Sequence, residues 1–333
     1  MAADQMRNAG RFGARSTALE VIAGHDLRGK NVIVTGGASG IGIETVRAFA
    51  SAGARVAIAT RDAVVAESVA ARLRQETGNP AIEVGVVDLM SLASIRAYVK
   101  SFLALHRPLH ILVNNAGIGS SPLAYTKDGF ESAFGTNHVG HFALTTGLLP
   151  ALKAAGKARV VMLSSLGLVY ADVDLDDPNF TRRPYDPKLA YDQSKTANAL
   201  FAVELTRRHA QDGITANAVH PGGVYPTGLQ KHLTREQVIA RGFIDSAGKL
   251  NPNFKTAEQG AATSVWAAVA PELDGIGGLF LDNCAISIPI PGDPRPIPEG
   301  TMRPLTGHKA YALDPANARR LWTVTEELIA GKG

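Results

Sequence analysis

Between residues 31 and 219, short apolar runs alternate with longer stretches in which apolar residues recur at helical spacing. The short runs lack regular polar alternation, so we predict strands that are covered on both faces. The expected strands are residues 31–35, 55–60, 82–87, 111–114, 158–164 and 215–219, with a seventh at 277–281. The expected helices are residues 41–51, 63–77, 92–105, 129–153 and 192–209. This alternation predicts an α/β fold with a doubly wound parallel sheet of about seven strands flanked by helices.

The segments outside this alternation suggest how the chain is divided. Residues 16–22 predict a short helix capped by Ser16 or Thr17, with Glu20 at the distance of a capping box. We therefore expect an N-terminal arm at residues 1–29, beginning with a mobile tail, and one domain at residues 30–333. Residues 225–255 mix apolar and basic side chains and predict a substrate lid, or alternatively a plain pair of surface helices. Residues 288–304 are rich in proline and predict irregular structure.

Composition and charge narrow the class of protein. The 333 residues are 45% hydrophobic, which suits a globular domain with a sizeable core. The net charge of +4 comes from scattered Lys and Arg residues, so we expect no nucleic-acid footprint. The single cysteine, Cys284, excludes an intramolecular disulfide and is typical of a reducing compartment. No stretch reaches the roughly 18 apolar residues of a membrane span, and no secretory core opens the chain, so we expect a cytoplasmic protein.

The first candidate for chemistry is the sequence VIVTGGASGIG at residues 32–42, an apolar strand followed by a turn and a helix start. Glycine permits unusual backbone angles there and lets backbone N–H groups approach a pyrophosphate, towards which the helix directs its positive end. An ordinary glycine-rich connection would give a similar pattern. We predict that the turn cradles the phosphates of a dinucleotide through Gly36, Ala38, Ser39, Gly40, Ile41 and Gly42.

The end of the second expected strand indicates which dinucleotide binds. A carboxylate usually stands there to accept the ribose 2′-hydroxyl of NAD. Here the strand ends at Thr60, and Arg61 follows. A guanidinium favours a 2′-phosphate, so we predict NADP(H) in preference to NAD(H). The alternative is that Arg61 only pairs with Asp62 on a solvated loop.

Two further strand ends supply candidate cofactor contacts. Asp88 and Leu89 follow the third strand and are expected to hold the adenine edge, although an Asp before a helix is as often a simple N-cap. The fourth strand is followed by Asn115, Ala116 and Gly117, small residues that would let a dinucleotide cross the edge of the sheet. An ordinary turn is the competing interpretation.

Tyr191 and Lys195 are the candidates for proton transfer. They lie four residues apart, so on a helix they share one face. An ammonium beside the phenol would lower its pKa, which suits a tyrosine that exchanges a proton with an alcohol or carbonyl. The fifth strand delivers Ser164 and Ser165 to the same edge of the sheet, where a hydroxyl could polarise a substrate carbonyl. On an exposed helix the same spacing would carry no function.

Taken together, these motifs resemble the short-chain dehydrogenases/reductases over about residues 16–333. They occur in order as T-G-x-x-x-G-x-G at 35–42, N-N-A-G at 114–117, Asn137 in a helix, S-S at 164–165 and Y-x-x-x-K at 191–195. The resemblance implies a Rossmann-type domain in which Tyr191 is the general acid/base. It also implies that Lys195 lowers the pKa of Tyr191 and holds the nicotinamide ribose, that Ser165 rather than Ser164 orients the substrate oxygen, and that Asn137 anchors a water.

The chain departs from the family pattern after the sixth strand. The family motif P-G-x-x-x-T is represented by Pro221, Gly222 and Val224, but Pro226 stands where the threonine is usual. Thr227 follows one residue later, so its contact with the nicotinamide amide is open.

A long interval between Ser165 and Tyr191 narrows the resemblance. The extra segment at residues 172–187 is rich in Asp, Pro and Arg, and together with the arm and residues 318–328 it resembles the retinol-dehydrogenase-like branch. That branch includes the oxidoreductase domain of WW-domain-containing oxidoreductases and commonly uses NADP(H) on apolar aldehydes and ketones. Protochlorophyllide reductases share a long interval but resemble the chain less.

Three functions are left open by the sequence. The first is an NADP(H)-dependent oxidoreductase that transfers hydride between nicotinamide and the carbonyl or alcohol of a hydrophobic or aromatic small molecule. The second is a cofactor-binding sensor or interaction protein, and the third is a reductase of C=C or C=N bonds. We expect no metal, because His138, His141 and His220 lack ligand spacing with a carboxylate or thiolate. Family members are often dimers or tetramers, so a homo-oligomer also stays open.

Overall fold

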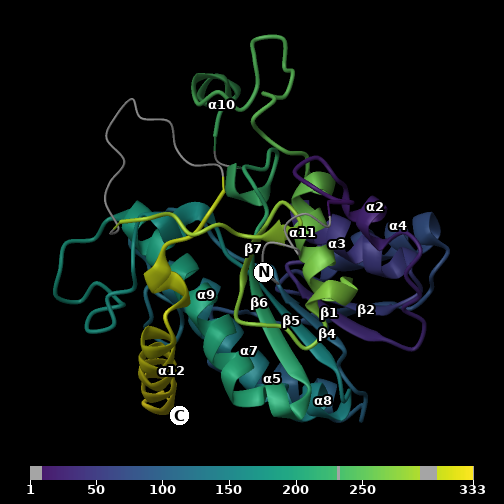
Figure 1. Cartoon of the computed structure of the whole chain (residues 1–333), viewed down its shortest axis with the longest axis horizontal. Helices are drawn as coiled ribbons and strands as arrows, with labels where there is room; N and C mark the ends of the chain where they lie inside the picture. The colour runs from purple at the N-terminus through teal and green to yellow at the C-terminus, as the bar shows by residue number, and fades with distance from the viewer. Residues whose placement is uncertain (1–9, 231–232, 293–305, 333) are drawn as a thin grey trace.

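A computed structural model of the chain describes residues 10–230, 233–292 and 306–332. Its centre is one eight-stranded sheet with the order β3-β2-β1-β4-β5-β6-β7-β8, in which every neighbouring pair is parallel except β7 and β8 (Figure 1). The strands are β1 (Asn31–Thr35), β2 (Arg55–Thr60), β3 (Ile82–Val86), β4 (Ile111–Asn114), β5 (Ala158–Leu163), β6 (Ile214–His220), β7 (Phe280–Asp282) and β8 (Ala285–Ile286). The doubly wound parallel sheet predicted from the sequence is confirmed, with a short antiparallel strand added.

Helices cover both faces of this sheet. One face carries α2 (Ala18–Ile22), α3 (Gly40–Ser51), α4 (Ala63–Thr77) and α11 (Ala257–Val269), which pack with one another (Figure 1). The other face carries α5 (Leu92–Leu103), α7 (Gly140–Gly147), α8 (Leu149–Ala154), α9 (Pro187–His209) and α12 (Pro315–Ala330). Because both faces are buried, β4 and β5 consist mostly of apolar residues, as expected for a parallel sheet, whereas β6 also buries Thr215, Asn217 and His220.

The tract expected to be one helix at residues 129–153 is divided. It consists of α6 (Ser132–Phe134), a π-helical turn at Gly135–Val139, then α7 and α8. Helix α9 begins at Pro187, five residues earlier than expected, because Asp186 accepts hydrogen bonds from the backbone N–H groups of Lys188 and Leu189. The sequence pattern missed both features because they depend on local hydrogen bonding rather than on apolar spacing.

The arm is fixed to the domain by its short helix. Thr17 and Glu20 form the predicted capping box at the start of α2, and the helix packs on α3 and α11. The first nine residues of the expected tail lie outside the described part of the chain, as do residues 293–304 of the proline-rich segment.

The segment at residues 172–187 is irregular, as expected for an insertion, and is held by the buried Asp177. The carboxylate of this residue accepts hydrogen bonds from the backbone N–H groups of Thr181, Arg182 and Arg183. Tyr185 donates to the Ser121 carbonyl at 2.9 Å, which ties the segment to the rest of the domain.

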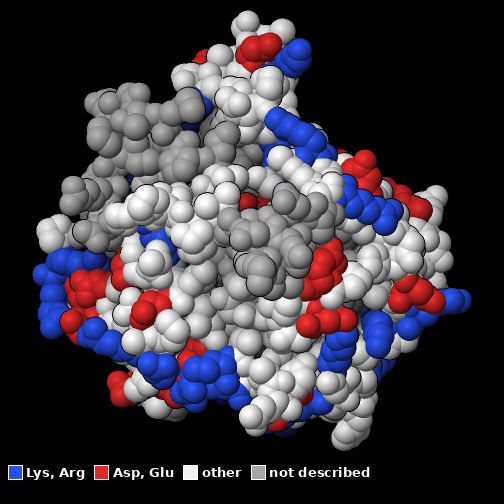
Figure 2. Space-filling model, in the orientation of Figure 1, with Lys and Arg blue, Asp and Glu red and all other residues white. Residues whose placement is uncertain are grey.

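The surface carries charges of both signs. On the face shown in Figure 2, Lys and Arg side chains lie among Asp and Glu around the rim. Within the described residues, no helix combines the length and the apolar character that crossing a membrane would require.

Candidate active site

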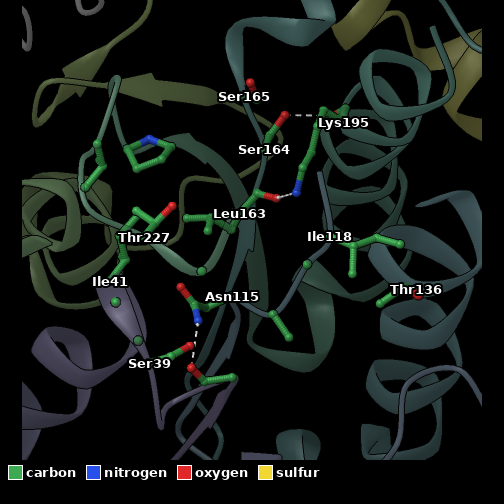
Figure 3. Close-up of a pocket in the computed structure, with 18 of the residues that line it drawn as sticks. Ser39, Ile41, Asn115, Ile118, Thr136, Leu163, Ser164, Ser165, Lys195 and Thr227 are labelled. Atoms are coloured by element: carbon green, nitrogen blue, oxygen red, sulfur yellow. Dashed lines mark hydrogen bonds between the residues drawn. The ribbon is translucent and has the colours of Figure 1, made fainter. Parts of the chain in front are cut away.

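A cavity of about 410 Å³ opens at the carboxyl edge of the sheet (Figure 3). It brings together residues from nearly every predicted motif, although these are spread from position 36 to position 227. The predicted residues that line it are Gly36, Ser39, Gly40, Ile41, Gly42, Arg61, Asp88, Leu89, Asn115, Ala116, Gly117, Ser165, Tyr191, Lys195, Pro221, Gly222, Val224 and Thr227. Of the residues named from the sequence, Ala38 and Asn137 do not line it.

The glycine-rich turn has the geometry that a phosphate cradle needs. Gly36 and Gly40 have φ angles of 64° and 48°, in the region that favours glycine. A Cβ on Gly42 would lie 2.2 Å from the Gly36 carbonyl oxygen, so no side chain fits there. Ser39 precedes α3 without a side-chain capping bond, which leaves the positive end of the helix available to an anion. The turn therefore fits the pyrophosphate of a dinucleotide.

Thr35 fastens this turn to the end of β4. Its hydroxyl oxygen accepts hydrogen bonds from the backbone N–H groups of Asn115 and Ala116, both at 2.9 Å. The Asn115 side chain returns a bond to the Thr35 carbonyl at 2.8 Å. Strands β1 and β4 are where the strand order reverses, which is the usual ligand site of an open α/β sheet.

Arg61 and Asp88 line the cavity just beyond the ends of β2 and β3. Arg61 is exposed, and Asp62 beside it is occupied as the N-cap of α4, where it accepts from the Val65 N–H. Asp88 forms an ion pair with Lys127 at 3.0 Å, and hydrogen bonds from Lys127 and the Met90 N–H hold the pKa of its carboxyl below the usual range against the effect of burial. The alternative in which Arg61 pairs with Asp62 is thus not what the structure shows.

The two adjacent serines after β5 have different environments. The Ser164 hydroxyl is buried and donates to the Lys195 carbonyl at 2.7 Å, as the dashed line in Figure 3 marks. Ser165 caps the short 3-10 helix Leu166–Val169, where its Oγ accepts from the Gly167 N–H at 3.1 Å, and its interaction with Tyr191 lowers the pKa of the phenol. Of the two serines, Ser165 is therefore the one that acts on the phenol.

Tyr191 and Lys195 occupy successive turns of α9. The Lys195 Nζ lies 5.5 Å from the centroid of the Tyr191 ring and donates to the Leu163 carbonyl at 3.1 Å. Burial lowers the pKa of Lys195 to about 8. Burial raises the pKa of Tyr191, the Ser165 bond lowers it, and the charge of Asp192 raises it. Burial, which the sequence argument left out, therefore dominates the pKa of Tyr191, and the lowering effect of Lys195 stays a prediction.

Asn137 lies behind the cavity in the π-helical turn. Its side chain accepts from the Ile118 N–H at 2.9 Å and donates to Ser194 Oγ at 2.9 Å. Its backbone carbonyl meets His141 Nδ1 at 2.9 Å. These contacts hold Ile118, which lines the cavity, so the structure places Asn137 as a support for the site.

Thr227 lies over the phosphate turn. Its Oγ1 donates to Gln230 Oε1 at 2.7 Å, and its Cα would be 3.7 Å from a Cβ on Gly40. The displacement of the threonine by one residue thus places it beside the glycines.

The segment predicted as a lid returns to its starting point, and three of its own aromatic side chains pack together. Its ends are paired, because the Tyr225 N–H donates to the Lys255 carbonyl at 3.0 Å and the Lys255 N–H donates to the Gly223 carbonyl at 2.7 Å. The ring centroid of Phe243 lies 5.2 Å from that of Tyr225 and 4.8 Å from that of Phe254. Phe243 and Phe254 line the cavity.

Several lining residues were not predicted as site residues. Thr60, Ile118, Leu163, Phe254 and Gln230 lie beside predicted positions but belong to no motif. His220 was considered as a metal ligand, and that role was rejected. The position of His220 directly before Pro221-Gly222 was the available signal, since the strand end delivers it to the edge of the sheet.

Comparisons with known proteins agree with this geometry. Residues 30–238 match the short chain dehydrogenase family. A Streptomyces lividans protein named "Probable oxidoreductase" is 44% identical over 300 residues, covering 89% of this chain and 96% of that protein. A WW domain-containing oxidoreductase of Danio rerio is 39% identical over 329 residues, covering 96% of this chain and 73% of that protein. Retinol dehydrogenase 12 of Mus musculus is 42% identical over 259 residues, covering 78% of this chain and 79% of that protein.

Solved structures show the same fold. A crystal structure of a Mycobacterium paratuberculosis protein superposes with a TM-score of 0.68 at 33% identity, covering 93% of this chain and 97% of the other. The Pseudomonas aeruginosa RhlG complex with NADP superposes with a TM-score of 0.61 at 27% identity, covering 77% of this chain and 95% of the other.

Proposed function

The chain belongs to the short-chain dehydrogenase/reductase family of oxidoreductases, and on that premise we propose that it is an NADP(H)-dependent carbonyl reductase or alcohol dehydrogenase. The observation that carries the proposal is the meeting of Ser165, Tyr191 and Lys195 in the cavity that the glycine-rich turn also lines. The resemblance to the family that the sequence predicted is confirmed.

In this proposal the proton is handled by Tyr191. When bound, NADPH supplies the hydride that reduces the carbonyl carbon. The Ser165 hydroxyl donates a hydrogen bond to the substrate oxygen and orients it, and the Tyr191 hydroxyl gives that oxygen its proton. Lys195 holds the nicotinamide ribose, and in alcohol oxidation the same groups act in the opposite direction. Asn137 supports these residues through Ile118 and Ser194.

NADP(H) is proposed over NAD(H) because of Arg61. Arg61 directly follows β2, the strand at whose end a carboxylate would select NAD, and it is exposed and lines the cavity. A guanidinium pairs well with a 2′-phosphate, whereas a carboxylate would repel it. Asp88, Leu89, Asn115, Ala116 and Gly117 complete the contacts with the adenosine and the ribose.

The substrate proposed for this site is a hydrophobic or aromatic carbonyl compound or alcohol. Phe243 and Phe254 present their rings to the cavity, and Ile118 and Leu163 add apolar surface near the catalytic side chains. Such a lining favours apolar over charged substrates because burying an unpaired charge is costly.

The proposed function also implies domain bounds, a location and a partner for the chain. We place the enzyme domain at residues 30–333, the arm at residues 1–29 and the substrate lid at residues 225–255. We also propose a cytoplasmic location and a small molecule as the partner, with neither nucleic acid nor membrane span involved.

Turnover with purified protein tests the proposal. We would follow NADPH and NADH oxidation over a panel of aldehydes and ketones, with Tyr191→Phe as the matched control, since it removes only the hydroxyl. Turnover with NADPH that Tyr191→Phe abolishes supports the proposal. NADPH binding without turnover of any carbonyl would favour a cofactor-binding sensor or interaction protein, and turnover of C=C or C=N substrates alone would favour the third function.

A further inference from the structure

His220 ends β6 beside Ser164, the residue before the proposed catalytic Ser165. The Ser164 N–H donates to the Val219 carbonyl at 2.8 Å, so His220 lies next to Ser164 across the β5–β6 pair. Side chains alternate along a strand. Ala218, two residues earlier, packs in the core on the face that α9 covers, whereas Val219 packs on the opposite face. The His220 side chain therefore lies on the same face of the sheet as Tyr191 and Lys195.

The imidazole is nearly enclosed, yet it lines the cavity. The residue is 7% exposed, and its Nδ1 is buried without any hydrogen-bond partner. Buried polar atoms are nearly always paired, so an unpaired one beside a ligand cavity calls for an explanation. Because Nδ1 is inaccessible to solvent, we infer that Nε2 is the ring nitrogen that can contact a ligand in the cavity.

The ring stays neutral over the working range of pH. Burial lowers the pKa of His220 to about 3, and the positive charge of Lys255 acts in the same direction. Lys255 is itself buried and donates to Asn283 Oδ1 at 2.8 Å. A neutral imidazole carries one proton, and an unpaired buried N–H is rarer in proteins than an unpaired acceptor. We assign that proton to Nε2, where it can be donated into the cavity.

We propose that His220 Nε2–H binds a second oxygen of the substrate, so that the enzyme prefers carbonyl compounds with another carbonyl or a hydroxyl group on the neighbouring carbon. Vicinal diketones and α-hydroxyketones form this class. The inference rests on the proposed function and extends it, since Ser165 and Tyr191 hold the reacting oxygen and His220 holds the next one.

The position of the ring places it beside the reacting oxygen of the substrate. His220 emerges on the face of the sheet that carries α9, where Tyr191 lies, and it adjoins Ser164 across the β5–β6 pair. Since Lys195 of α9 would hold the nicotinamide ribose on this same face, the binding measurements below separate a substrate oxygen from the nicotinamide amide. A neutral donor among apolar side chains also suits an uncharged oxygen better than a carboxylate.

The experiment compares phenylpropanedione, a vicinal diketone, with propiophenone, which lacks the second carbonyl. The readout is the ratio of kcat/KM for the two ketones with NADPH. His220→Leu should lower this ratio about 10-fold, the value of one hydrogen bond to a neutral group. His220→Gln keeps an N–H donor and should recover most of the ratio. Binding of NADP⁺ and of its fragment lacking nicotinamide is measured in parallel by calorimetry.

Each outcome decides the proposal. An unchanged ratio in His220→Leu, or a wild-type enzyme that does not favour the diketone, overturns the assignment while the proposed function stands. If His220→Leu binds NADP⁺ more weakly but binds the fragment without nicotinamide as the wild type does, the proposal is overturned and His220 is assigned to the nicotinamide amide. If the wild type turns over neither ketone nor any other carbonyl, the proposed function fails first. If His220→Leu does not fold, the comparison of wild type with His220→Gln and His220→Asn decides, because Asn carries the donor on a shorter side chain.

Discussion

The Arg15 guanidinium donates a hydrogen bond to the Phe254 carbonyl at 2.8 Å, although the two residues are 239 positions apart in the chain. It also donates to the Pro252 carbonyl, and the Arg15 carbonyl accepts from Gln259 at 3.2 Å. Phe254 is one of the two aromatic side chains that the lid contributes to the cavity. The N-terminal arm thus fixes the end of the lid at which it rejoins the domain.

Removing this link should affect the substrate but not the cofactor. We expect Arg15→Ala to raise KM for an apolar ketone by about 3- to 10-fold, because one or two neutral-acceptor bonds no longer position Phe254. The dissociation constant for NADPH should stay within about twofold of wild type, within ordinary error. Arg11→Ala changes the same arm without touching the lid and serves as the control. Equal effects of both variants on KM would contradict the positioning role.

Substitutions of the two serines after β5 should affect different properties, stability for Ser164 and catalysis for Ser165. Ser165→Ala removes the hydroxyl that meets Tyr191, and we expect kcat/KM to fall by at least about 100-fold. Ser164→Ala removes a buried bond to the Lys195 carbonyl, and we expect it to lower the free energy of unfolding by about 1 kcal/mol. Steady-state kinetics and urea unfolding of both variants provide the test. The assignment is wrong if Ser164→Ala is the less active of the two.

The cofactor preference should depend on Arg61. Arg61→Ala is expected to weaken NADPH binding by about 10-fold or more and to leave NADH binding nearly unchanged, since only NADPH has the 2′-phosphate. Arg55 is also exposed and stands at the other end of β2, paired with Glu83, so Arg55→Ala is the matched control. Fluorescence titration with both nucleotides measures the difference. A parallel loss for NADH would exclude recognition of the phosphate.

Acid should destabilise the fold through histidines that are buried in the neutral form. Burial lowers the pKa of His138 from 6.5 to about 3 and that of His141 to about 4. The unfolded chain therefore binds more protons below pH 6.5, so stability falls as the pH falls. Between pH 6.5 and about pH 5, one such residue contributes up to about 2 kcal/mol of this loss.

Urea unfolding at these two pH values measures the loss. His138→Gln, which removes the titrating ring next to Thr325, should make the unfolding free energy less dependent on pH. An identical pH dependence in wild type and variant would show that His138 does not contribute.

Most of the sheet could be predicted because parallel strands that are buried on both faces appear in the sequence as short apolar runs. Residues 55–60 and 111–114 were predicted at the bounds that the structure has. The π-helical turn at Gly135–Val139 could not be predicted, because a shift from α to π hydrogen bonding changes no side-chain pattern. Likewise, the early start of α9 depends on the capping bonds of Asp186.

Within the site, motif spacing predicted which residues meet but not how each side chain is engaged. Arg61, Ser165 and Tyr191 reach the cavity as expected, because strand ends on one edge of the sheet converge. Asn137 is bonded to Ile118 and Ser194, contacts that the motif did not indicate, and its expected role in anchoring a water stays a prediction. The pKa of Tyr191 depends on burial, which no local pattern reveals.

The strand order also keeps the residues proposed to select the nucleotide apart from those proposed to select the ketone, which matters for protein engineering. Arg61 and Asp88 follow β2 and β3, whereas Ser165 follows β5, and β1 and β4 lie between them. Three strand spacings amount to roughly 14 Å, beyond the distance at which substitutions usually couple. The effects on kcat/KM of substitutions that alter nucleotide preference should therefore multiply with those of substitutions that alter ketone preference. Each preference can then be optimised in a separate library of variants, and the best substitutions can be combined in one chain.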